Sequence, residues 1–202
     1  MPNKIIRPAV VFAALVLLAG CAHVPAGSTH DAFFANLRML CGKAFAGTVE
    51  VDRPAAPGND AFAGKPLVMH VRECDDDTVR IPFHVGDDRS RTWVVTRTTT
   101  GLRLKHDHRH ADGASDAVTM YGGDTTASGT STRQEFPVDA ESVAMFEREG
   151  LAASVTNTWA VELQPGTRFT YELARPGGRL FRVRFDLSAP VAPPPPPWGS
   201  SD

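Results

Sequence analysis

The sequence predicts a mainly β protein in which an antiparallel up-and-down meander closes into a barrel or a strongly curled sheet. Apolar and polar residues alternate with a period of two over many short segments, as in strands with one buried face. Clusters of Gly, Pro and Asp separate these segments and indicate tight turns between consecutive strands. A meander of about ten strands joined mostly by short turns favours a barrel.

The composition narrows the class of protein. The chain has 202 residues, of which 42% are hydrophobic and 22% charged, values typical of a globular protein. Its 21 basic and 23 acidic residues give a formal net charge of −2. Nucleic-acid binding requires a strongly basic face. We therefore expect one folded domain with tails and no nucleic-acid partner.

Residues 1–20 have the pattern of a secretory signal peptide. Lys4 and Arg7 precede an unbroken apolar run at residues 9–19. A helix needs about 20 residues to cross the hydrocarbon core of a bilayer, so this run is too short to span it. The pattern predicts export from the cytoplasm.

The segment Leu18-Ala19-Gly20-Cys21 resembles the lipobox of bacterial lipoproteins. The resemblance implies cleavage before Cys21, a diacylglycerol on its sulfur and a fatty acyl chain, such as palmitate, on its new amino terminus. More than one acyl chain gives stable membrane anchoring. Ala22, rather than aspartate, follows the cysteine and implies anchoring in the outer membrane, facing the periplasm. The alternative is an ordinary signal peptide that happens to end near a cysteine.

The remaining chain divides into three parts. Residues 21–30 are expected to form a lipidated tether, residues 31–188 a single β-rich domain, and residues 189–202 a Pro-rich tail. We expect the tail to be disordered. The alternative is a docking peptide with Trp198 as its anchor, which would make the protein a scaffold that recruits an envelope partner.

Two segments have helical periodicity. Asp31–Ala44 follows the possible N-cap residues Ser28 and Thr29, and 139–149 begins at the possible N-cap Asp139. Their apolar sides contain Phe33, Leu37 and Leu40 in the first helix, and Val143 and Phe146 in the second.

Ten segments are candidate strands. The first seven are Thr48–Asp52, Pro66–Glu73, Thr78–Val85, Arg91–Thr98, Leu102–His110, Ala117–Tyr121 and Arg133–Val138. The last three follow the second helix and place on one face Trp159, Val161 and Leu163, then Phe169, Tyr171 and Leu173, then Phe181, Val183, Phe185 and Leu187. Trp93 and Trp159 are expected in the core. This layout resembles the calycin, or lipocalin-like, architecture, although no diagnostic lipocalin motif is present.

With Cys21 lipidated, an even pair of cysteines remains for an oxidising compartment. A disulfide between Cys41 and Cys74 would tie the end of the first helix to the second strand. Closing such a loop stabilises a fold by about 3–4 kcal/mol in the chain-entropy model. The alternative, a catalytic thiol at Cys41, has no Cys-x-x-Cys partner.

A histidine cluster is the main candidate site. His106, His108 and His110 recur every second residue, so on a strand their side chains share one face. Neutral imidazoles are ligands for Zn²⁺, and His70 and His84 on earlier strands would complete the set. The alternative is a group of hydrated histidines at a strand end, where Lys105 and Arg109 would oppose a bound cation.

The stretch from Gly64 to Thr125 carries a second resemblance. Its segments GKPLVMHVREC, IPFHVG, RTWVV, LRLKHDHRH and YGGDT resemble a family of secreted bacterial proteins of unknown function. This resemblance covers about a third of the chain and implies no activity, substrate or site residues. The sequence has no Gly-x-Ser-x-Gly, His-Glu-x-x-His or P-loop motif.

Three functions are therefore open. The first is an outer-membrane-anchored periplasmic lipoprotein whose barrel binds a small apolar ligand or a cell-envelope partner. The second is a zinc-dependent envelope enzyme that uses His106, His108 and His110, in which the metal would acidify a water molecule. The third is the scaffold with the Pro-rich tail. The first hypothesis depends on the lipobox, on the meander and on the lack of a catalytic signature.

Overall fold

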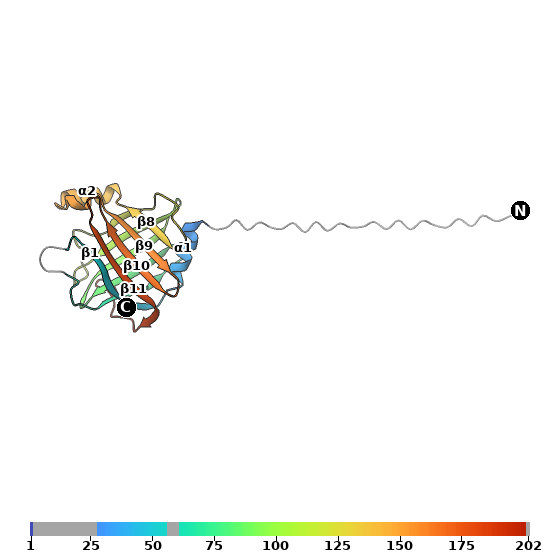
Figure 1. Cartoon of the computed structure of the whole chain (residues 1–202), viewed down its shortest axis with the longest axis horizontal. Coiled ribbons are helices and arrows are strands. Elements are labelled where there is room, and N and C mark those ends of the chain that lie inside the picture. Colours follow the sequence, from blue (N-terminus) through green and yellow to red (C-terminus); the bar gives the residue numbers. More distant parts are fainter. Residues whose placement is uncertain (2–27, 56–60, 201–202) are drawn as a thin grey trace.

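The computed structural model describes residue 1, residues 28–55 and residues 61–200 (Figure 1). The predicted signal peptide, the lipobox and Cys21 lie outside these residues, so the lipid anchor stays a prediction. No helix in the described part of the chain is long and apolar enough to cross a membrane.

The described residues form a nearly closed, barrel-like antiparallel sheet of eleven strands, which confirms the predicted fold class. Helix α2 lies along the upper rim of the barrel in Figure 1 and helix α1 at its right-hand side. The helices are α1 (Thr29–Arg38) and α2 (Ala140–Arg148), with a short 3-10 turn at Ala152–Ser154. The strands are β1 (Ala44–Arg53), β2 (Leu67–His70), β3 (Glu73–Cys74), β4 (Thr78–Val85), β5 (Asp88–Arg97), β6 (Leu102–His108), β7 (Tyr121–Asp124), β8 (Arg133–Pro137), β9 (Thr158–Gln164), β10 (Arg168–Ala174) and β11 (Leu180–Val191).

The strand order shows where the barrel closes. Along the sheet the order is β7-β6-β5-β4-β2-β1-β11-β10-β9-β8, with β3 paired to β4. The first and last strands therefore pair with each other, from Ala44 opposite Val191 to Arg53 opposite Leu180. The seam falls instead between β7 and β8, which are consecutive in the sequence. The chain goes up and down around the whole barrel, as predicted.

Glycines and the start of α2 close this seam. A Cβ on Gly123 would lie 1.7 Å from the carbonyl oxygen of Pro137, so only glycine allows the two backbones to approach. The Ser142 hydroxyl accepts a hydrogen bond from the Gly122 N–H at 2.8 Å. The Asp139 N–H donates to the Gly122 carbonyl at 2.9 Å. Helix α2 thus supplies partners that a strand ladder would otherwise provide.

Helix α1 has one of the expected N-cap residues, Ser28, but it begins two residues earlier than predicted, at Thr29, and also ends earlier. Ser28 and Asp31 form a capping box, and Phe33, Phe34 and Leu37 are buried in the core. The predicted helix Asp31–Ala44 was too long at its C-terminal end. The Gly42 N–H donates to the Val71 carbonyl at 2.7 Å, and the Val71 N–H donates to Lys43 at 3.0 Å. This pairing takes the chain out of the helix, and Ala44 already begins β1.

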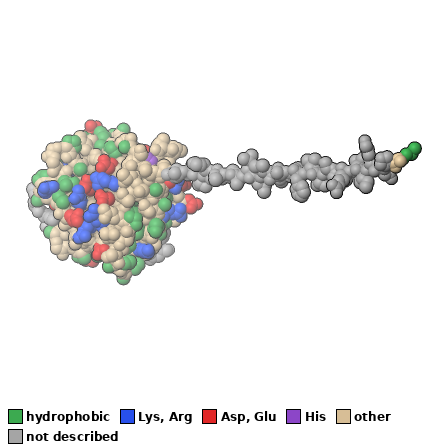
Figure 2. Space-filling model, turned by 45° about the vertical axis from the view of Figure 1, so that its right-hand side comes forward, with side chains coloured by type: hydrophobic (Ala, Val, Ile, Leu, Met, Phe, Trp, Pro, Cys, Tyr) green, Lys and Arg blue, Asp and Glu red, His purple; other side chains and the backbone are tan. Residues whose placement is uncertain are grey.

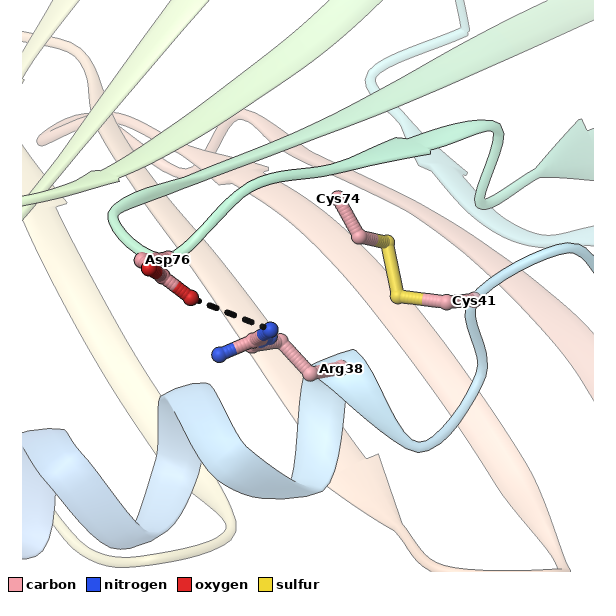
Figure 3. The surroundings of a disulfide bond; sticks show 4 residues. All are labelled: Arg38, Cys41, Cys74 and Asp76. Carbon is pink, nitrogen blue, oxygen red and sulfur yellow. Dashed lines mark ion pairs between the residues drawn. A yellow bond between two sulfur atoms is a disulfide. The ribbon is translucent and has the colours of Figure 1, made fainter.

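The structure contains the predicted disulfide. Cys41 and Cys74 are joined, with their Cα atoms 6.3 Å apart (Figure 3). Beside the disulfide, a guanidinium nitrogen of Arg38 lies 3.6 Å from a carboxylate oxygen of Asp76. The bond links the segment after α1 to β3, so α1 is held at its end of the barrel.

Two predicted strands differ from the structure. The segment expected to form a strand at Ala117–Tyr121 instead has an irregular, turn-like backbone, and β7 begins only at Tyr121. An Asp116 carboxylate oxygen accepts a hydrogen bond from the Val118 N–H at 2.8 Å, which stabilises this turn-like backbone. The predicted strand Pro66–Glu73 is divided into β2 and β3.

The C-terminal segment also differs from the disordered tail that the sequence predicted. Strand β11 continues to Val191, and the chain then follows the barrel wall. The Trp198 N–H donates to the Arg89 carbonyl, and the Arg89 guanidinium donates to the Pro196 carbonyl, both at 3.1 Å. Proline lacks an N–H and cannot extend a ladder, but its carbonyl still accepts. The wall supplies the partners that composition alone could not reveal.

The outer surface carries interleaved basic and acidic side chains rather than a single-sign patch on the side that Figure 2 shows. On the outer face of β8–β11, Glu172 accepts hydrogen bonds from Arg133 at 3.2 Å and Arg182 at 2.6 Å. Burial raises the pKa of Glu172, but these bonds outweigh it and the net pKa is lowered. Such pairing suits a wet outer face over an apolar core.

Candidate functional site

The end of the barrel away from α1 contains a cavity of about 180 Å³. The direction of β6 fixes this placement. Gly101, just before the strand, lies against His30 of α1. His106 and His108, at the far end of the strand, line the cavity. Half of the residues that line the cavity are Phe, Trp or Tyr: Phe62, Phe83, Trp93, Tyr121, Tyr171 and Phe181.

These rings hold one another in place. Trp93 stacks between Tyr171 and Phe83, with ring centroids 4.5 and 4.8 Å away and interplanar angles of 20° and 17°. His106 stacks on Tyr121 with centroids 4.6 Å apart and planes 11° apart. Aromatic side chains have few rotatable bonds and gain additional attraction from such offset contacts. The cavity wall is therefore preformed.

Both ring nitrogens of His106 have hydrogen-bond partners. Its Nδ1 lies 3.0 Å from the Tyr121 carbonyl oxygen, and its Nε2 lies 2.8 Å from the Tyr171 hydroxyl. A carbonyl only accepts, so Nδ1 carries the proton and Nε2 accepts the hydrogen of Tyr171. Burial lowers the pKa of His106 to about 3 and raises the pKa of Tyr171. This pair is neutral at pH 7 and fixes the cavity floor.

His108 and Tyr121 form a second neutral pair. The Tyr121 hydroxyl lies 3.1 Å from Nε2 of His108. Burial, followed by the charge of Arg91, lowers the pKa of His108, and burial raises the pKa of Tyr121 to about 12. An imidazole and a phenol can each donate or accept a hydrogen bond. This pair is the polar group in the wall best suited to meet a ligand.

Two partly exposed arginines mark the opening. The guanidinium carbon of Arg91 lies 5.9 Å from the ring centroid of Phe62, and that of Arg179 lies 5.8 Å from the ring of Phe181. Both residues line the cavity. Each guanidinium thus presents a flat cation over an aromatic edge of the opening. Their carboxylate partners are Asp88 and Asp52, respectively.

The other predicted histidines lie elsewhere. His110 follows β6, and its exposed ring lies 3.8 Å from a carboxylate oxygen of Asp116. His70 and His84 are buried on the outer face of β2 and β4, because strand alternation places Met69 and Phe83 inside. Burial lowers the pKa of both, that of His84 to about 4.

The histidines expected to bind zinc are therefore not brought together. The predicted shared face of His106 and His108 is confirmed, but His110, His70 and His84 do not join them. Both ring nitrogens of His106 already have partners. Across residues 28–55 and 61–200, no three His, Cys, Asp or Glu side chains are grouped to hold a metal ion.

Sequence reasoning overlooked most of the cavity wall. Trp93 was expected only in the core, and it is indeed buried, with 4% of its surface exposed, but one edge of its ring also lines the cavity. The inward alternation of Tyr171 was visible in the sequence. Tyr121 lies opposite His106 in the β6–β7 strand pair, at the end of the predicted strand Ala117–Tyr121, but the sequence did not show that its ring would stack on the imidazole.

Comparisons of the chain with protein-family models, with curated proteins and with solved structures gave no match. The resemblances to the lipobox and to a family of secreted bacterial proteins therefore stay predictions.

Proposed function

We propose that this protein is a lipid-anchored lipoprotein of the bacterial outer membrane whose barrel domain binds a small ring-containing molecule in the aromatic cavity. The observation that supports ligand binding is the preformed cavity, which combines stacked aromatic walls with one neutral polar pair. A mostly apolar pocket with a few convergent polar groups is the usual form of a small-molecule site.

The cavity volume limits the ligand. A cavity of about 150 Å³ lined by apolar side chains accommodates benzene, and this cavity is only slightly larger, at about 180 Å³. It therefore fits one six-membered ring with one or two small substituents. A long acyl chain would not be enclosed. Trp93 is stacked between Phe83 and Tyr171, so an edge of its ring rather than a face meets the ligand. Aromatic edges favour an aromatic ring over a saturated one, because an edge-to-face contact requires the face of an aromatic partner.

The polar groups specify the substituent. His108 and Tyr121 are neutral and can satisfy one hydroxyl or carbonyl group of the ligand. Arg91 and Arg179 at the opening are each paired with an aspartate, so the opening carries no excess positive charge. We therefore favour an uncharged phenol-like ring over an aromatic carboxylate.

Titration calorimetry of the full chain with p-cresol, benzoate and cyclohexanol tests the proposal. We expect p-cresol to bind most tightly. Leu173→Phe places a larger side chain at the cavity wall and is expected to weaken p-cresol binding by about tenfold or more, equivalent to about 1.4 kcal/mol. Leu151→Phe, at an exposed leucine outside the cavity, is the matched control. No p-cresol binding, or equal affinity in both variants, would contradict the proposal.

The anchor is tested separately. Two or more acyl chains on Cys21 would keep the protein with the outer membrane. Cys21→Ser is expected to abolish metabolic labelling with palmitate and to leave a protein that no longer sediments with outer membranes. An unlabelled parent protein would contradict the anchor and leave ligand binding by the domain unaffected.

A further inference from the structure

We propose a second binding site on the outside of the barrel, for an uncharged saccharide. A polar groove of about 470 Å³ lies between residues 197–200 and the outer face of β4–β6. We call it the tail groove. Its walls include the side chains of Glu73, Arg80, Ser90, Asp107, Arg109 and Trp198.

Strand alternation separates the tail groove from the aromatic cavity. Trp93 and His106 point into the barrel, whereas Ser90 and Asp107 on the same two strands line the groove. Thr92 borders both sites, but the groove otherwise has its own side chains and its own chemistry, and we expect it to take a different ligand.

Asp107 organises the charged wall of the groove. Its side chain is only 5% exposed, and it accepts hydrogen bonds from Arg80 at 2.7 Å and from Arg109 at 3.2 Å. Glu73 lies 3.5 Å from Nε of Arg80, and the Gly113 carbonyl accepts a hydrogen bond from Arg109 at 3.2 Å. A guanidinium has five N–H donors, so both arginines retain donors beyond these contacts. Asp107 acts as a positioning residue that holds the two donor groups in place.

The charges in the groove balance. Arg80 and Arg109 face Glu73 and Asp107, so the wall offers no net attraction to an anion or a cation. It does offer donors on the arginines, acceptors on the half-exposed Glu73, and the hydroxyl of Ser90. A sugar carries adjacent hydroxyl groups that each donate and accept, and it fits such a mixed, neutral surface better than a charged ligand does.

Trp198 supplies the remaining feature of a saccharide site. An indole ring offers a flat apolar face against which the C–H groups of a pyranose can pack. The backbone that carries this ring is held at the groove, because the backbone N–H of Trp198 donates to the Arg89 carbonyl and the Arg89 guanidinium donates to the Pro196 carbonyl. The preceding run Pro193–Pro197 is stiff, which reduces the entropy lost when a ligand orders the wall.

Ligand-observed NMR and calorimetry on the full chain test the tail groove with cellotetraose, maltotetraose and chitotetraose. We expect at least one to bind with a dissociation constant of about 1 mM or tighter. Trp198→Ala should weaken that binding by about tenfold or more, whereas Trp198→Phe, which keeps an aromatic ring, should retain most of it. Val191→Ala changes an exposed residue that precedes the proline run and lies outside the groove, and it should leave affinity unchanged.

Tetragalacturonate serves as the anionic probe. Tighter, salt-sensitive binding of this probe than of all three neutral tetrasaccharides would overturn the proposal of an uncharged ligand. No saccharide binding at about 10 mM, or equal affinities in W198A and the parent protein, would overturn the site itself. Binding of p-cresol in W198A serves as the check that the barrel is folded.

Discussion

The inside and the outside of strands β4–β6 differ sharply, although they are built from alternate residues of the same segments. Inside, Phe83, Trp93 and His106 form part of a mostly apolar, aromatic cavity. Outside, Arg80 and Asp107 form part of a polar groove. His106 and Asp107 are adjacent in the sequence and almost equally buried, at 3% and 4% exposure.

The difference shows that partners, rather than burial alone, decide what a buried titratable group contributes. The partners of His106 are a carbonyl and a phenol, so burial prevails and the imidazole stays neutral. The partners of Asp107 are two guanidinium groups, which offset the penalty of removing a carboxylate from water. The inside therefore suits a neutral apolar ligand, and the outside suits a polar one.

The substitution with the largest expected effect on stability disrupts the seam of the barrel, and therefore both the cavity inside and the tail groove outside. Gly123→Ala would place a Cβ 1.7 Å from the Pro137 carbonyl oxygen, and backbone atoms on both strands would have to move. We expect a loss of about 3 kcal/mol or more in the free energy of unfolding, measured in urea. Gly166→Ala is the control, because it meets nothing within 4 Å and adds only the strain of a positive φ. Equal stability of the two variants would contradict the role of Gly123 in the seam.

The substitution with the next largest expected effect on stability changes only the outer face of the barrel. Asp107→Ala removes the acceptor shared by Arg80 and Arg109, and we expect a loss of about 2 kcal/mol in the free energy of unfolding. Binding of p-cresol should remain, whereas saccharide binding should be lost because the donor groups are no longer positioned. Asp75→Ala, at an exposed aspartate, is the matched control. A loss of p-cresol binding in Asp107→Ala alone would show that the two sides are coupled.

The pH dependence of the free energy of unfolding tests the inside of the barrel alone, through the buried His106. The pKa of His106 is about 3 in the folded protein against an ordinary value of 6.5. Between these values the unfolded chain binds a proton that the folded chain excludes, so this histidine makes stability fall as the pH falls from 6.5 towards 3. Its largest contribution to the slope is about 1.4 kcal/mol per pH unit.

Urea unfolding at several pH values measures that slope. His106→Gln and His106→Phe both remove the titrating ring and differ in packing, so both should reduce the slope between about pH 6 and pH 4 by the same amount. A slope unchanged in both variants would contradict a neutral, buried His106.

The sequence revealed the local pattern of both sides but not what each side contacts. Alternation correctly placed Leu102, Leu104, His106 and His108 on one face, and the meander was correct in its order. The partners of His106 come from β7 and β10, which lie 15 and 65 residues away. Tyr121 lies on the strand next to β6, whereas Tyr171 is reached only across the interior of the barrel, a contact that local periodicity does not encode. The histidines expected to bind zinc are not brought together for this reason, since alternation determines which face a histidine takes but not which side chains lie opposite it.

The C-terminal tail also shows that contacts with distant residues escape local sequence patterns, but here the unforeseen contacts order a segment that was expected to be disordered. A proline run has no N–H groups with which to form regular structure, so composition predicted disorder. The wall nevertheless holds it through the Arg89 backbone and side chain. Because those few hydrogen bonds are partly exposed, deleting residues 192–202 should lower the free energy of unfolding by only about 1 kcal/mol.

Deletion of the tail, which has the smallest expected effect on stability, should also change the pKa of His84. Pro194 and Pro195 lie over the same hollow as His84, whose Nε2 is buried without a hydrogen-bond partner in the described residues. Burial, then the charges of Arg89 and His70, lowers the pKa of His84 to about 4, and Asp88 acts in the opposite direction. Deleting the tail admits water to this ring, so the pKa of His84 measured by NMR should rise towards 6.5.

Trp198→Ala separates the two roles of the tail. This variant keeps the prolines over His84, so the pKa of His84 should stay near 4 while saccharide binding is lost. An unchanged His84 pKa after complete deletion would mean that the barrel wall alone buries the ring. A rise in both proteins would mean that Trp198 holds the whole proline run in place. In that case the tail groove and the proline cover form a single structural unit on the outside of the barrel.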